Sequence, residues 1–131
     1  MHIENIKAAI AVMERTPDDE FYLGNWFCGT AACFGGALAR SPEGRAMGLT
    51  IVRVDNGDDD EDNEVRIEAA NPSNPAKPFR HEDAIGHVLD LDPTTTWKLC
   101  YPSGYAPLKT EAVLPKHVVE KLQKLLRDGT L

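Results

Sequence analysis

A cysteine ahead of a glycine-rich helical segment is the feature of this sequence best suited to chemistry. Cys28 is followed by Gly29 and Thr30, and the spacing predicts a helix that begins near Thr30. The positive end of a helix dipole favours a thiolate, and its free backbone N–H groups can hold an anion. A histidine base would complete a cysteine-dependent hydrolase or transferase. The candidate bases are His81, His87 and His117.

The same segment also fits a binding surface with no catalytic step. The helix predicted after Thr30 carries Gly35 and Gly36, and each glycine costs roughly 1 kcal/mol of helix propensity relative to alanine. Adjacent glycines are typical of a site where another helix or a ligand comes close. Core packing is the third interpretation, because cysteine is among the most buried residue types. The predicted binding residues are Trp26, Cys28, Gly29, Thr30, Gly35 and Gly36.

The sequence contains only one of the two close ligand pairs that a zinc site requires. Cys28 and Cys33 have a spacing that zinc ligands adopt, but a zinc site needs a second close pair. Cys100 stands alone. His81 and His87 are six positions apart and would not share one face of a helix. We therefore predict no metal and no cofactor.

The negative charge is concentrated in one segment, residues 55–64. The chain has 21 acidic and 14 basic residues; seven of the acids lie in 55–64, and the other 14 balance the bases. A basic excess is therefore absent, which argues against binding of nucleic acid or of an anionic membrane. An EF-hand register starting at Asp58 would end on Ala69, where calcium requires a glutamate. The segment is predicted to be a solvated loop, or a contact for a basic partner.

These candidates are positioned by the elements of one predicted α+β domain over residues 1–131, with about five helices packed around a β-hairpin. Apolar spacing predicts helices over 2–14, 30–40 and 81–89, then one opening at Asp92-Pro93 and a last one from Pro115 that ends at Gly129. A further short turn is expected to reach residue 47. Strands over 49–54 and 64–69 enclose the acidic loop 55–64, and a Pro-rich connector spans 71–78. Trp26 and Trp97 are expected to anchor the core or an interface.

The cellular location is predicted from what the sequence lacks. The first residues do not have the basic-then-apolar layout of a signal peptide. The longest apolar run, from Ala8 to Met13, is far shorter than the roughly 20 residues of a membrane span. Three cysteines are too few for a disulfide scaffold and odd in number. We therefore expect a cytoplasmic protein.

The order of these motifs resembles a family of small bacterial and bacteriophage proteins. The resemblance is carried by Phe21, Trp26, Cys28-Gly29-Thr30, Cys33, Gly36-Ala37, Val88-Leu89-Asp90-Leu91, Leu99-Cys100-Tyr101 and the helix from Pro115. The family pattern has a bulky aromatic residue where this chain has Ala37. The resemblance implies a bacterial or phage origin and carries over no catalytic residue.

The sequence leaves two main function classes open, besides a third in which residues 55–64 act as an acidic mimic that blocks a nucleic-acid-binding protein. The first is a small non-catalytic binding or adaptor protein whose ligand is a protein partner or a second copy of the chain. Residues 26–36 would form its contact surface, with 55–64 as a secondary contact. The alternative is the cysteine-dependent hydrolase or transferase, with Cys28 as nucleophile and His81, His87 or His117 as base.

Overall fold

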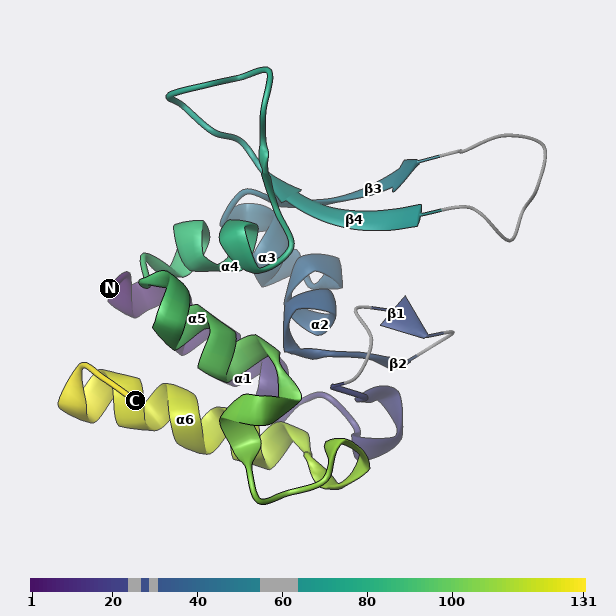
Figure 1. Ribbon diagram of the computed structural model, residues 1–131, viewed down its shortest axis with the longest axis vertical. Helices are drawn as coiled ribbons and strands as arrows, with labels where there is room; N and C mark the ends of the chain where they lie inside the picture. The colour runs from purple at the N-terminus through teal and green to yellow at the C-terminus, as the bar shows by residue number, and fades with distance from the viewer. Residues whose placement is uncertain (24–26, 29–30, 55–63) are drawn as a thin grey trace.

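Six helices form the body of the described structure, in the order that the apolar spacing predicts. The computed structural model describes residues 1–23, 27–28, 31–54 and 64–131, and the side chains at 27, 28, 31, 54 and 64 lie outside that description. The helices are α1 (Ile3–Glu14), α2 (Phe34–Arg40), α3 (Pro42–Ala46), α4 (Glu82–Leu89), α5 (Pro93–Cys100) and α6 (Pro115–Asp128). Figure 1 shows the sheet lying along one side of this helical body. The α+β class is therefore confirmed, and the expected turn near residue 47 is the helix α3.

The predicted hairpin is present and gains a third strand. Strands β3 (Leu49–Val54) and β4 (Glu64–Ala69) pair antiparallel, with Leu49 opposite Ala69 and Ile51 opposite Ile67. Strand β5 (Phe79–Arg80) then pairs with the other edge of β4, and the order is β3-β4-β5. Residues 55–63 of the predicted acidic loop lie outside the described residues. A third strand meets the physical need that two strands alone are marginal in water.

The Pro-rich connector, residues 71–78, forms turns between β4 and β5. Its three prolines predict an extended connector and exclude a helix; the structure has no helix here but has turns, and Asn71 makes two hydrogen bonds within them. The side-chain amide of Asn71 donates to the carbonyl of Lys77 at 3.2 Å, and its Oδ1 accepts from the backbone N–H of Ser73 at 3.0 Å. The connector brings the chain back along β4 and sets the position of Phe79.

Helix α2 lies at the centre of the fold and begins later than predicted. The expected start near Thr30 is wrong, because Ala31–Ala32 form strand β2, paired with β1 (Phe27–Cys28). Strand pairing here overrides the helix propensity of alanine. Cys33 is the N-cap, and every residue from Phe34 to Ala39 is buried. A helix that is apolar on all sides fits only in a core.

Helices α4 and α5 follow each other after a short turn and cross closely, and this crossing is the part of the fold that positions the candidate site. Asp90 ends α4 in a left-handed conformation with φ 54°. Asp92 caps α5, as predicted, by accepting from the backbone N–H of Thr95 at 3.2 Å, and Pro93 occupies the first turn. The helices approach closely because Gly86 has no side chain: a Cβ there would lie 2.9 Å from Oγ1 of Thr96.

One core takes side chains from α1, α2, α4, α5, α6 and the sheet, and α6 and α1 pack side by side (Figure 1). The apolar spacing of α6 predicts a stripe of Val118, Leu122, Leu125 and Leu126; the first three are buried and Leu126 is partly buried. Gly129 ends the helix with φ 76°. The largest fully buried side chains include Phe34, Ile6, Met13, Leu38, Leu49, Ile67, Ile85, Leu89, Leu99, Leu122 and Leu125. None of the helices in the described part of the chain has the length and apolar character needed to cross a bilayer.

Candidate functional site

A cavity of about 570 Å³ lies between α4, α5 and the strand β5. Its volume is within the range of roughly 300–1,000 Å³ that is typical of ligand pockets. The close crossing at Gly86 and Thr96 forms its base, and both residues line the cavity. The two helices and the strand that follows the connector therefore build a site that none of them would form alone.

Trp97 lines the cavity, and contacts with Tyr101 and Ser103 fix the orientation of its ring. Its side chain is 49% exposed, so it does not anchor the core as one alternative predicted. The ring stacks on Tyr101 with centroids 4.0 Å apart, and its indole N–H donates to Oγ of Ser103 at 3.0 Å. The hydroxyl of Tyr101 in turn donates to Oε2 of Glu82 at 2.8 Å. This chain of contacts links a fixed aromatic surface on α5 to a carboxylate on α4.

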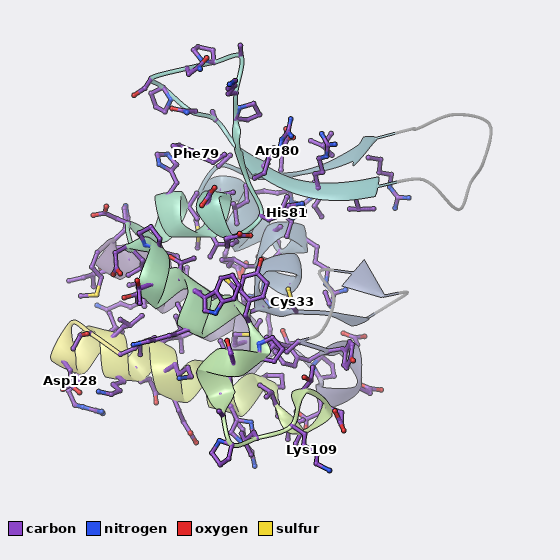
Figure 2. The ribbon with its side chains drawn as sticks, viewed as in Figure 1. Cys33, Phe79, Arg80, His81, Lys109 and Asp128 are labelled. Carbon is purple, nitrogen blue, oxygen red and sulfur yellow. The ribbon has the colours of Figure 1, made fainter. Side chains whose placement is uncertain are left out.

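Phe79 and His87 form a second aromatic pair on the same cavity. Their ring centroids are 4.6 Å apart and the rings are 27° from parallel. Figure 2 shows Phe79 on β5, directly beside α4. His87 lies one turn after Asp83 on α4, and its ring packs on Phe79.

Three carboxylates line the cavity: Glu82, Asp83 and Asp90. Neither lysine nor arginine is among the described residues that line it. Asp90 accepts from the amino group of Met1 at 2.8 Å, which lowers the pKa of its carboxyl. Glu82 has one oxygen bonded to Tyr101, and the exposed carboxylate of Asp83 has no ion pair within the described part of the chain. The cavity therefore combines aromatic faces with negative charge, a combination that recognises cations.

The predicted binding segment, residues 26–36, is only partly described. Trp26, Gly29 and Thr30 lie outside the described residues, and so does the side chain of Cys28. Gly35 and Gly36 are described and are buried inside α2. Because both are buried, they offer no exposed surface to a partner.

The catalytic hypothesis loses one of its premises. Cys28 lies in β1, opposite Ala31 of β2, and α2 begins only at Phe34, so Cys28 does not directly precede a helix N-terminus. The dipole argument for an activated thiol at Cys28 therefore does not apply.

The three candidate bases do not gather at one place. His87 lines the cavity between α4 and α5, while His117 lines a separate cavity beside Tyr105. Nδ1 of His117 accepts from the backbone N–H of Leu114 at 2.9 Å, which caps α6. His81 is the N-cap position of α4 and has the unusual backbone angle φ 51°. Each histidine therefore has a different structural environment, and the thiol of Cys28 lies outside the described side chains.

The other two cysteines are buried: Cys33 at the N-cap of α2 and Cys100 at the end of α5. Cys33 and Cys100 are each 2% exposed, and Figure 2 shows Cys33 at the start of α2. Burial raises the pKa of the Cys33 thiol from 9.0 to about 11 and raises that of Cys100 well above its ordinary value. These thiols are therefore protonated and unreactive at neutral pH. Across the described residues, no cluster of three His, Cys, Asp or Glu side chains is arranged to hold a metal ion.

Sequence reasoning did not assign the cavity between α4 and α5 to function. Its signals were visible separately: a tryptophan on α5, acidic residues on α4, and Gly86 and Thr96 at positions where two helices could cross closely. What was missing was the knowledge that α4 and α5 cross closely and that Phe79 joins them through a third strand.

Comparison with protein-family models, with curated proteins and with solved structures found no match for this chain. The resemblance to small bacterial and phage proteins therefore stays a prediction.

Proposed function

We propose that this protein is a small non-catalytic binding protein that recognises a basic segment of a protein partner through the cavity between α4 and α5. One observation carries the proposal: an exposed tryptophan and three carboxylates share a cavity whose described lining has no lysine or arginine. A desolvated cation would gain both cation–π attraction and charge-assisted hydrogen bonds there. The proposal retains the expected cytoplasmic location and the bacterial or phage origin.

The charge distribution of the whole chain supports a basic partner. The net charge is -7, and seven acidic residues are concentrated in 55–64. Long-range attraction from this charge would accelerate encounter with a basic partner, while the cavity would supply the close contacts. The two contributions differ in their response to salt, because screening weakens distant charges more than contacts inside a cavity.

A labelled peptide of alternating arginine and lysine tests the proposal by fluorescence anisotropy. We expect it to bind, and we expect a matched acidic peptide not to bind. Asp83→Asn should weaken binding roughly ten-fold, the amount that the loss of one charge-assisted contact allows. Glu111→Gln removes an exposed acidic charge on another part of the surface and should leave the affinity almost unchanged.

A variant with the acidic residues of 55–64 changed to their amides distinguishes long-range electrostatic attraction of the partner from direct contacts in the cavity. It should slow association and reduce the salt dependence, while the effect of Asp83→Asn persists in it. Binding that disappears in this variant and is unaffected by Asp83→Asn would contradict the proposed site.

A further inference from the structure

The wall formed by Trp97 has the features of a surface that receives a flat cation. Tyr101 covers one side of the indole ring, and the bond from its N–H to Ser103 fixes the orientation of the ring. Trp97 is 49% exposed and lines the cavity. A fixed ring lowers the entropic cost of stacking a ligand on it.

Two carboxylates that line the same cavity as Trp97 differ in exposure. Glu82 is half-buried and connected to the Trp97–Tyr101 stack by the hydroxyl of Tyr101. That bond occupies Oε2 of Glu82 and leaves the other oxygen able to accept. Asp83 follows it in the chain and is exposed at the rim. A ligand that satisfies both carboxylates must present several N–H groups in different directions.

We propose that the cavity selects an arginine side chain, whose guanidinium stacks on Trp97 while its N–H groups bond to Glu82 and Asp83. Guanidinium is planar, carries five N–H donors and is more weakly hydrated than ammonium, so it gains more than lysine from a ring and two carboxylates together. The cavity volume of about 570 Å³ also leaves room for the long aliphatic stem. The inference rests on the proposed function and names the residue that the basic partner inserts.

Three short capped peptides test the selectivity; they are identical except for a central arginine, lysine or citrulline. Citrulline keeps the shape of arginine without its charge. The readout is the indole N–H resonance of Trp97 in a proton–nitrogen spectrum, assigned by its absence in Trp97→Phe. We expect the arginine peptide to shift this resonance and to bind roughly five-fold or more tightly than the lysine peptide, as a cation–π contribution allows. The citrulline peptide should produce no saturable shift.

Two variants separate the roles of the ring and of the charge, with binding followed by calorimetry. Trp97→Leu should bring the affinities for the arginine and lysine peptides together, whereas Asp83→Asn should weaken both. Tyr22 is another exposed aromatic residue, 37% exposed, and Tyr22→Leu should leave the preference unchanged. Circular dichroism of each variant checks that the fold is retained.

The outcomes distinguish the two proposals. Equal binding of the arginine and lysine peptides, with both weakened by Asp83→Asn, would overturn the arginine selectivity and leave the basic-partner function standing. If none of the single-cation peptides binds and the mixed basic peptide binds without dependence on Asp83, both proposals are wrong.

Discussion

Gly86 on α4 and Thr96 on α5 meet where the two helices cross, and the side chain of Thr96 occupies the space that a Cβ at Gly86 would need. The nearest atom, Oγ1 of Thr96, would be 2.9 Å from that Cβ, and it is fixed by its own bond to the carbonyl of Asp92 at 2.9 Å. The hydroxyl therefore cannot move aside without losing its acceptor. This contact sets the distance between the two helices that line the candidate site.

Gly86→Ala should destabilise the protein by about 1 kcal/mol, because overpacking outweighs the gain in helix propensity. In a Thr96→Ala background the same change should become neutral or stabilising, since the atom it meets has been removed. Urea denaturation of the four proteins of this double-mutant cycle measures the coupling. Additive free energies of unfolding would show that the contact does not set the crossing.

The carboxylate of Asp92 should stabilise the fold at neutral pH, and this stabilisation should be lost on acidification. Hydrogen bonds from the side chain and then the backbone of Thr95 lower the pKa of its carboxyl. A lowered folded-state pKa gives stability that is present above the unfolded value and is lost as pH falls through the folded value. Asp92→Asn keeps an acceptor at the cap and should show a smaller loss of Tm on acidification, whereas Asp92→Ala should have a lower Tm at every pH. An acid limb that is identical in wild type and Asp92→Asn would contradict this role.

The thiol of Cys33 should lower stability at alkaline pH. Its pKa is raised from 9.0 to about 11 by burial, so the folded state holds a proton that the unfolded chain releases. The free energy of unfolding is therefore unaffected by this thiol below its unfolded-state pKa. Between the unfolded-state and folded-state pKa values it falls by about 1.4 kcal/mol per pH unit. Cys33→Ala has no thiol to ionise and should show a shallower decline in chemical denaturation.

Alkylation of the native protein, resolved by peptide mass spectrometry, measures the same burial in another way. We expect Cys33 and Cys100 to react only at the rate of unfolding. Fast reaction of either one in the native state would contradict their burial. Cys28 is followed in the same experiment, and fast reaction with an apparent pKa well below ~8.5 would favour the hydrolase or transferase alternative.

The backbone at His81 should favour glycine. Its φ of 51° lies where side chains with a Cβ are strained, although its backbone N–H bonds to the carbonyl of Ile67 at 2.7 Å. His81→Gly and His81→Ala remove the same imidazole, so they differ mainly in this strain. We expect the glycine variant to be more stable than the alanine variant by about 1–2 kcal/mol in thermal unfolding. A more stable alanine variant would show that the backbone relaxes at this position.

Local signals were enough to predict most helices, because capping and apolar spacing act within a few residues. As expected, Asp92-Pro93 begins α5 and Gly129 ends α6. Strands β3 and β4 match their predicted bounds. The errors lie where strand pairing decides the outcome. Ala31–Ala32 pairs with the neighbouring strand β1 instead of starting a helix, and β5 exists only because the turns of the connector return Phe79–Arg80 to β4.

The candidate site was harder to predict for the same reason. Trp97 was identified as an anchor, but its exposure depends on which face of α5 turns toward α4. The carboxylates on α4 carried no signal of their own, because acidic residues in the first turn of a helix are common. Only the crossing of α4 and α5 and the return of Phe79 place these side chains around one cavity.

The burial of α2 on every side has a consequence for how this protein opens. The helix contacts α1, α3, α5, β2, β3 and β4, and its Phe34 and Leu38 are fully buried, so separation of these elements from the body would remove packing from a core helix. Partial unfolding that spares the rest of the molecule is therefore costly near α2. The amide hydrogens that bond within α2 should therefore exchange with solvent only when the whole chain unfolds. Their exchange would then report the free energy of global unfolding.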